Sequence, residues 1–265
     1  MNDVYTHGHE EPVLRSHEWR TAENSAGYLL AHLHPGQRLL DVGCGPGTIT
    51  VDLAARVAPG EACGIDAAPE VIAIAEARRG AGEGNVTFAT GDVYTLDFDD
   101  ASFDVVHGHQ VLQHLTDPVA ALREVRRVLR PGGIAAFRDS DYAGFVWAPR
   151  IEGLDRWLDL YHQVTARNGA EADAGRYLLG WAHAAGFDDA SASSSTWTFA
   201  DRSSRSWWGG LWADRVVGSS FASQAVDYGL TSPDELAGIA AAWRRWAEDE
   251  DGFFAVVHGE VIAHR

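Results

Sequence analysis

The first half of the chain alternates between short apolar runs and longer amphipathic stretches. The runs RLLDVG, EACGID, VTFATGD, SFDVVHGH and IAAFRDS have the length and apolar content of buried strands. The stretches between them place apolar residues at helical spacing: Thr48 to Ala58, APEVIAIAEARR and Pro118 to Arg130. Strands that alternate with helices of this length predict a parallel sheet with helices on both faces.

The flanking regions follow a different pattern. Ahead of the first strand, Ser16 to Leu33 has apolar residues at helical spacing and predicts one amphipathic helix, with Ser16 as its N-cap and HPGQ after its end. After Tyr142 the pattern predicts two helices, at about Arg150 to Asn168 and Ala172 to Ala185, followed by a β-rich run, ASASSSTWTFA. A helical insertion rich in Trp, Ser and Gly comes next, at residues 201–232. The chain then continues with one more helix, Pro233 to Glu248, and a last strand, GFFAVVHGEVIAHR.

Charge and cysteine content narrow the classes of function. Acidic residues outnumber basic residues 38 to 21, which gives a formal net charge of −17, and the arginines are scattered along the 265 residues. Nucleic acid binding needs clustered Lys and Arg, so we expect no nucleic acid partner. No run approaches the ~20 apolar residues of a membrane span. With two cysteines, Cys44 and Cys63, and a polar N-terminus, we expect a cytoplasmic protein without a disulfide framework.

The segment LLDVGCGPGTITVDL, residues 39–53, places three glycines at the first turn from strand to helix: Gly43, Gly45 and Gly47. In open α/β sheets ligands bind beyond the carboxyl ends of the strands, and glycine lets a ligand lie against the backbone. The spacing is G-x-G-x-G with Thr at position 48, so it departs from the G-x-G-x-x-G of dinucleotide sites, and no phosphate-binding G-x-x-x-x-G-K-[ST] loop is present. A turn without a ligand remains an alternative for this stretch alone.

Two carboxylates follow the next two predicted strands. Asp66 ends the second strand, where a carboxylate can accept hydrogen bonds from both ribose hydroxyls. Asp92, in TGDVY, ends the third strand, where a carboxylate can accept from an adenine amine. The alternatives are a cap on the helix that begins near Pro69 and an Asp within a turn. Together, the glycine loop and the two carboxylates predict three contacts to one adenosine.

These motifs resemble the class I S-adenosylmethionine-dependent methyltransferases, of the small-molecule kind similar to ubiquinone and menaquinone biosynthesis methyltransferases. LLDVGCGPG resembles the glycine-rich first motif, GID the second, ATGDV the third, and FDVVHGHQVLQHLTDPVAALREVRRVLRPGG the fourth strand and its following helix, so the resemblance covers about Leu39 to Asp139. It implies S-adenosylmethionine as cofactor, S-adenosylhomocysteine as product and no metal. It also implies these cofactor-binding positions: Asp41, Gly43, Gly45, Asp66, Ala67, Asp92, Val93, His109 and Gln110.

Within this set, the resemblance implies that Gly43 and Gly45 pack on the methionine part and that Asp41 orients the loop. Asp66 is expected at the ribose, Ala67, Asp92 and Val93 at the adenine, and the His109 carbonyl at the cofactor's amino group, with Gln110 beside it. The implied fold is α/β, a doubly wound, Rossmann-like, mostly parallel seven-stranded sheet with an antiparallel last strand. We expect an N-terminal helical lid (1–36), a cofactor-binding core (37–142), a helical aromatic cap with one core strand at about 188–200 (143–230), and a terminal helix with the last strand (231–265).

Methyl transfer is an in-line displacement, for which the protein must mainly align the acceptor in a water-poor pocket. A general base is optional, and the candidates are His114 and Tyr142, although a packed histidine is the alternative reading of His114. His7, His9 and His17 could be read as metal ligands, but no matching Asp or Glu pattern accompanies them, so no metal is expected. The family pattern instead suggests that the first 20 residues cover the cofactor, with Tyr5 or Arg20 near it.

Aromatic residues outside the core sheet are the candidates for the acceptor site: Phe145, Trp147, Trp207, Trp208 and Trp212. Trp208 and Trp212 at helical spacing could equally be core. We predict methyl transfer to an O, N or C atom of a small, aromatic or apolar metabolite of secondary metabolism. The alternatives are a protein of the same fold that binds S-adenosylmethionine without methyl transfer, and an NAD-dependent dehydrogenase, which Thr48, GDV and the terminal strand disfavour. The sequence predicts neither the acceptor nor the oligomeric state.

Overall fold

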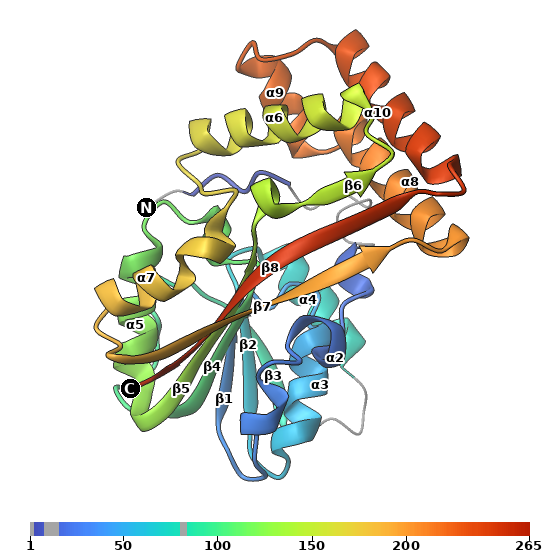
Figure 1. The fold of residues 1–265 in the computed structure, drawn as a ribbon. Coiled ribbons are helices and arrows are strands. Elements are labelled where there is room, and N and C mark those ends of the chain that lie inside the picture. Colours follow the sequence, from blue (N-terminus) through green and yellow to red (C-terminus); the bar gives the residue numbers. More distant parts are fainter. Residues whose placement is uncertain (1–2, 8–15, 80–83) are drawn as a thin grey trace.

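The computed structural model describes residues 3–7, 16–79 and 84–265, and its centre is a single eight-stranded sheet. The strand order is β3-β2-β1-β4-β5-β8-β6, and β7 pairs with β8 as well (Figure 1). Strands β1 to β5 pair in parallel, and β8 runs antiparallel to β5, β6 and β7. The bounds are β1 Leu39–Val42, β2 Ala62–Asp66, β3 Val86–Thr90, β4 Phe103–His109, β5 Leu129–Ser140, β6 Val146–Ala148, β7 Asp189–Phe199 and β8 Phe253–His264. The predicted fold class is confirmed, with short β6 as a strand that the sequence analysis missed.

Helices cover both faces of the parallel part of the sheet. Because successive strand residues point to opposite faces, Leu39 packs with α2 (Ala22–Ser25), α3 (Thr48–Val57) and α4 (Pro69–Arg78). Leu40 packs on the other face with α5 (Pro118–Val128) and α7 (Leu178–Ala184). All four residues of β1 are buried, as expected of a strand covered on both faces. The sheet therefore holds the turn after β1 in a fixed position at its carboxyl edge.

The remaining helices form a cap beyond that edge: α6 Glu152–Arg167, α8 Arg202–Gly218, α9 Ser220–Asp227 and α10 Pro233–Glu248. In Figure 1 they gather at the top, where β8 and β7 rise out of the sheet. Four tryptophans, each with 2 % or less of its surface exposed, fill the cap interior: Trp157, Trp212, Trp243 and Trp246. Burial of aromatic side chains of this size supplies a large part of the stabilisation of such a small subdomain.

The region predicted as one helix from Ser16 to Leu33 is broken, so that prediction is wrong. Residues 16–18 are helical, α2 spans Ala22–Ser25, and a 3-10 turn, η1, spans Leu30–His32. The cause is a capping box, in which Thr21 Oγ1 accepts from the Asn24 amide and Asn24 Oδ1 accepts from the Thr21 amide. This arrangement starts a new helix at Ala22 and prevents continuation from Ser16. The apolar side chains still reach the core at Ala22, Ala26 and Leu29.

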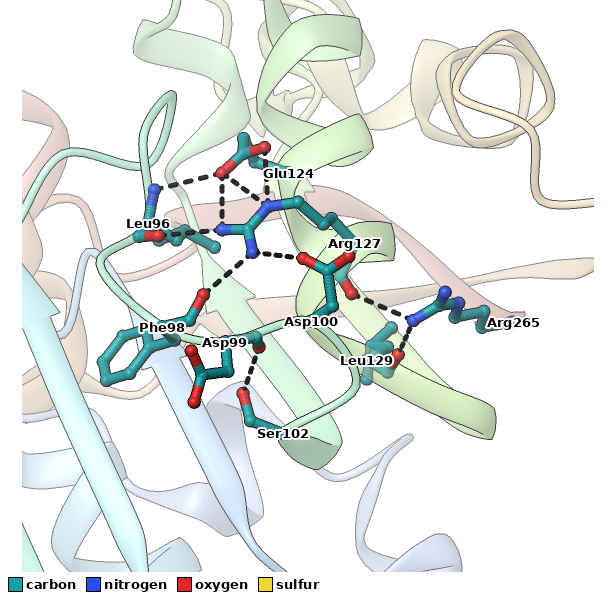
Figure 2. A network of polar contacts seen from close by, with 9 residues as sticks. All are labelled: Leu96, Phe98, Asp99, Asp100, Ser102, Glu124, Arg127, Leu129 and Arg265. Carbon is teal, nitrogen blue, oxygen red and sulfur yellow. Dashed lines mark hydrogen bonds and ion pairs between the residues drawn. The ribbon is translucent and has the colours of Figure 1, made fainter.

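The loop between β3 and β4 is fastened to α5 by one arginine (Figure 2). The Arg127 guanidinium donates to the carbonyl oxygens of Leu96 and Phe98, at 2.8 Å each, and pairs with Asp100 and Glu124. A planar fork of donors suits this multiple recognition, which a lysine cannot reproduce. The loop that follows Asp92 is thereby held against the body of the protein. No helix among the described residues is long and apolar enough to cross a membrane.

Candidate active site

A cavity of about 610 Å³ lies between the carboxyl edge of the sheet and the cap. Every residue predicted for the site lines it except Trp147. The glycine loop and the ends of β2 and β3 form one half, which we call the loop half. The second half, which we call the aromatic half, is lined by Tyr5, His7, His114, Tyr142, Phe145, Trp197, Trp207, Trp208, Trp212 and Arg215. The volume is in the range of small-molecule sites.

The loop half depends on backbone conformations that glycine adopts easily. Gly43, Gly45 and Gly47 have φ angles of 64°, 56° and 81°. A Cβ at Gly43 would lie 2.4 Å from Val111 Cγ2, so a side chain could not be placed there without a shift. Asp66 accepts from the Gly45 amide (3.0 Å) and from the Ala68 amide (3.1 Å). The carboxylate thus ties the loop to the start of α4, and it also lines the cavity.

Asp41 is a buried anchor under the same loop. Its Oδ1 lies 2.7 Å from His107 Nδ1 on β4, and its Oδ2 accepts from Thr50 Oγ1 on α3 at 2.5 Å. These contacts fix the end of β1 to its neighbouring strand and to the helix that follows the loop. This is the geometry expected of a residue that orients the loop.

The end of β3 supplies the exposed side of the loop half. The β2–β3 register sets Asp66 opposite Thr90, so Asp92 follows two residues beyond this pair. The Asp92 carboxylate accepts from the Tyr94 amide at 2.9 Å, which is a turn contact, and both Asp92 and Val93 line the cavity. Ala67 lines it beside Asp66. The turn interpretation and a ligand contact are therefore compatible at Asp92.

The end of β4 contains a strained residue. Gln110 has a φ of 55°, which is uncommon outside glycine and is often found at functional sites. Its Oε1 accepts from Arg20, and its Nε2 contacts Ser140 Oγ (2.7 Å) and His258 Nε2 (3.0 Å). Gln110 therefore links the N-terminal segment to β5 and β8. Its neighbour His109 is 5 % exposed, and burial lowers its pKa well below the usual value.

Arg20 is the cation whose side chain binds Gln110 at this junction. Besides the bond to Gln110, its guanidinium lies 5.8 Å from the centre of the Trp197 ring, and its Nε has no hydrogen-bond partner. Within the described part of the chain, no carboxylate forms an ion pair with Arg20. Burial lowers its pKa to about 10, so it keeps its charge at neutral pH.

In the aromatic half, the two candidate bases are both uncharged at neutral pH. Burial lowers the pKa of His114 to about 3, and burial raises the pKa of Tyr142 to about 12. His114 Nε2 contacts Gln113 Nε2 at 3.0 Å, and its ring packs edge-on against Tyr5. His114 thus has the surroundings of a packed histidine. Tyr142 contacts His7 Nε2 at 3.3 Å.

Trp147 does not line the cavity. On β6 its side chain points the other way and stacks on Phe254 at 5.7 Å, with Arg150 4.7 Å from the centre of its ring. Trp212 is both a cavity residue and a core residue, because it lines the cavity and also packs edge-on against Trp157 at 4.5 Å. Trp208 likewise lines the cavity while it stacks on Phe199.

Several lining residues were not assigned to the site from the sequence. Arg215 lies seven residues after Trp208 and three after Trp212, so the three share one face of α8, and this helical spacing is the signal that could have identified Arg215. Trp197 was read only as part of a strand, and His7 only as a possible metal ligand. Among the described residues, no group of three or more His, Cys, Asp or Glu side chains is placed to hold a metal ion. His9 lies outside the described residues.

A parallel sheet with an antiparallel last strand, a glycine loop after β1 and carboxylates at the ends of β2 and β3 define the class of S-adenosylmethionine-dependent methyltransferases. A family model described as a methyltransferase domain matches residues 33–186. The chain is 36 % identical over 267 residues to an uncharacterized methyltransferase of Schizosaccharomyces pombe, covering 97 % of this chain and 95 % of that protein.

The chain is also 30 % identical to the probable methyltransferase ltbC of Aspergillus luteorubrus, covering 98 % of this chain and 96 % of that protein. The solved structure of the YcgJ protein from Bacillus subtilis has a TM-score of 0.58 and 20 % identity, and the match covers 92 % of this chain and 98 % of that one. The chain belongs to the methyltransferase domain family, and the prediction of a methyltransferase is confirmed.

Proposed function

We propose that this enzyme transfers the methyl group of S-adenosylmethionine to a small, aromatic or apolar metabolite of secondary metabolism. The observation that carries the proposal is that a single cavity contains both the loop half and the aromatic half. Cofactor and acceptor can therefore meet inside one enclosed space. Displacement at a methyl group requires this alignment more than it requires a charged catalytic group.

The loop half fits the proposed cofactor. The backbone at Gly43 and Gly45 is bare, as close approach of the methionine part requires, and Asp66 and Asp92 lie at adjacent strand ends for the ribose and the adenine. Ala67 and Val93 lie beside them, and the His109 carbonyl is the proposed contact of the cofactor's amino group. When bound, S-adenosylmethionine supplies an electrophilic methyl on a sulfonium. Asp41 acts beneath the loop by fixing its position.

We further propose Arg20 as the partner of the cofactor's α-carboxylate. It is a partly buried cation that lines the same cavity as the glycine loop, and no carboxylate in the described part of the chain forms an ion pair with it. Charges that are largely withdrawn from water are normally paired in proteins, so an anionic ligand group would complete the site. Gln110 holds the guanidinium in place from the end of β4.

The aromatic half would bind the acceptor and exclude water. Phe145, Trp207, Trp208 and Trp212 supply apolar ring surfaces, which favour a flat or ring-bearing molecule. His114 and Tyr142 are neutral at physiological pH, so neither adds a charge that would hold water. Exclusion of water strengthens the few polar contacts that orient the acceptor.

Calorimetric titration with S-adenosylhomocysteine, with NAD and NADP run beside it, tests the cofactor assignment. We expect micromolar binding of the sulfur compound alone, and loss of at least tenfold in affinity in Asp66→Ala, because the ribose contact and the loop contacts are both removed. Asp188→Ala, at an exposed carboxylate outside the cavity, is the matched control and should bind as the wild type does. Binding of NAD without response to S-adenosylhomocysteine would contradict the proposal.

A further inference from the structure

Three side chains in the aromatic half form a hydrogen-bonded cluster that neither the fold nor the cofactor site requires. His7 Nε2 lies 3.0 Å from the Tyr161 hydroxyl and 3.3 Å from the Tyr142 hydroxyl. The two tyrosine rings stack at 3.9 Å with 15° between their planes. His7, Tyr142 and Tyr161 are 6 %, 4 % and 1 % exposed. His7 and Tyr142 line the cavity, whereas Tyr161 lies behind them.

The segment that carries His7 is fixed from both sides. Asp3 accepts from the amide (3.0 Å) and the hydroxyl (2.7 Å) of Thr116 on the core. On the cap side, Thr6 Oγ1 accepts from Asn168 at 3.0 Å, and the Tyr5 carbonyl accepts from Gln224 at 3.2 Å. His7 is therefore held in place by backbone and side-chain contacts of its neighbours, and its ring can serve as a fixed acceptor for a tyrosine hydroxyl.

The protonation states of His7, Tyr142 and Tyr161 determine whether the Tyr142 hydroxyl can accept a hydrogen bond from a ligand in the cavity. Burial lowers the pKa of His7 and raises the pKa of both tyrosines, so the imidazole is neutral and both phenols keep their hydrogens. Both hydroxyls lie within hydrogen-bond distance of His7 Nε2. When Tyr142 donates to Nε2, its hydroxyl hydrogen has an acceptor within the cluster. The Tyr142 oxygen then keeps a lone pair that can accept a hydrogen from a ligand.

The groups that face His7 come from four elements. Arg215 and Trp212 lie on α8, Tyr161 on α6, Tyr142 after β5, and His114 after β4. Arg215 and Arg20 both lower the pKa of His7, so a proton on the imidazole is unfavourable while the sulfonium cation is also present. Methyl transfer removes the sulfonium charge. A proton that reaches His7 in the same step leaves the total charge of the cavity unchanged.

We propose that Tyr142 binds the hydroxyl group of the acceptor and that His7 receives the proton through Tyr142, which makes this enzyme an O-methyltransferase. The proposal rests on the proposed function and specifies the attacking atom. In the step, an acceptor oxygen lone pair forms the new bond to the methyl carbon, and the sulfur keeps the electron pair of the broken S–C bond. The hydroxyl proton moves to the Tyr142 oxygen, while the Tyr142 proton moves to His7 Nε2. The imidazolium releases its proton to water after the product leaves.

The first test measures binding of two probes to the complex with S-adenosylhomocysteine. In calorimetry we expect 1-naphthol to bind about five- to tenfold more tightly than 1-methoxynaphthalene, because only 1-naphthol can donate to Tyr142. The ratio should fall below twofold in Tyr142→Phe and in His7→Leu. It should survive in Tyr161→Phe, which leaves the bond between His7 and Tyr142 intact, and in Val4→Ala, an exposed control in the same segment.

The second test separates a proton relay from simple positioning. His7→Gln retains an oxygen that can accept from Tyr142 but cannot take a proton at neutral pH. It should therefore keep the binding preference for 1-naphthol and yet lose about 100-fold in the rate of S-adenosylhomocysteine formation from S-adenosylmethionine and 1-naphthol. The KM for S-adenosylmethionine should stay within twofold.

Four results would overturn the inference: equal binding of the two probes, no binding or methylation of 1-naphthol, a preference that survives in Tyr142→Phe, or a wild-type rate in His7→Gln. Affinity for S-adenosylhomocysteine, measured on every variant, shows whether the protein is folded. It also distinguishes the two proposals, since wild-type protein that binds S-adenosylhomocysteine but ignores 1-naphthol contradicts only this inference.

Discussion

Replacement of Arg20 by Gln should weaken binding of S-adenosylhomocysteine far more than binding of 5′-methylthioadenosine, which lacks the amino acid part. Arg20 is proposed to contact only the α-carboxylate, so the smaller ligand never gains from it. A hydrogen bond to a charged group contributes about 1.5–3 kcal/mol, and 1.4 kcal/mol corresponds to a tenfold change in affinity. We therefore expect affinity for S-adenosylhomocysteine to fall by about 10- to 150-fold.

The comparison of two ligands corrects for damage to the protein. Arg20→Gln also removes the bond to Gln110, and any resulting shift at the end of β4 affects both ligands alike. The ratio of the two affinities isolates the carboxylate contact. Arg20→Lys retains a charge and should recover part of the loss. Arg244→Gln, at an exposed arginine of α10 outside the cavity, is the control and should match the wild type for both ligands.

Calorimetry at pH 7.5 is the assay, because Arg20 with a pKa of about 10 is fully charged there. If both ligands weakened by the same factor, Arg20 would be a structural tether of Gln110 with no part in carboxylate recognition. If neither weakened, the cofactor's carboxylate would be bound elsewhere, and Arg20 would have no role in cofactor binding.

Three further predictions concern stability and specificity. Burial raises the pKa of Asp139 to about 7, above its unfolded value, so its contribution to the free energy of unfolding is fully present below pH 4 and is lost as pH rises through about 7. Between pH 5 and pH 8 this contribution changes by about 2–3 kcal/mol, and Asp139→Asn should remove that change in urea titrations at the two pH values. An unchanged difference from wild type at the two pH values would contradict the assignment. Arg127→Lys should lower the free energy of unfolding by about 2 kcal/mol, because one ammonium cannot replace the separate guanidinium nitrogens that bind two carbonyls and two carboxylates. A loss below about 0.5 kcal/mol would show that the loop is held by other contacts. Trp147→Ala should cost about 3–5 kcal/mol in the same assay while leaving probe binding to the cavity unchanged, whereas Trp207→Ala should weaken probe binding with little effect on stability.

The sequence was most informative where chemistry is set by neighbours along the chain. Gly43 and Gly45 follow a buried strand directly, Asp66 ends β2 and Asp92 follows the end of β3 by two residues, so parallel pairing places all four at one edge. These four residues come together because they lie at the ends of paired parallel strands, whatever the more distant residues of the chain are. The break before Ala22 was also locally encoded, because Thr21 and Asn24 have the spacing of a capping box.

The aromatic half could not be assembled in this way because its members come from segments far apart in the chain. His7 meets Tyr161 across 154 positions, and Asn168 meets Thr6 across 162. No periodicity links such residues, and only the packing of the cap against the sheet brings them together. The direction of the Trp147 ring could not be predicted from the sequence either, because it is set by the position of Trp147 in a strand of three residues. A composition rich in tryptophan therefore predicts an aromatic region but not which rings face a ligand.

The loop half is thus encoded by short continuous stretches of sequence, whereas the aromatic half is assembled from distant segments. The loop half uses backbone conformation and carboxylates at or just after strand ends, which a short continuous sequence can specify, and it lies within the residues that the methyltransferase family model matches. The aromatic half is built by the N-terminal segment, α8 and the turns after β4 and β5, each held by its own contacts. Substitutions in these segments can alter the acceptor without disturbing the glycine loop. In the proposed function, the identity of the acceptor is set by the contacts of His7, Tyr142 and the surrounding rings, and neither His7 nor Tyr142 lies within the motifs between Leu39 and Asp139.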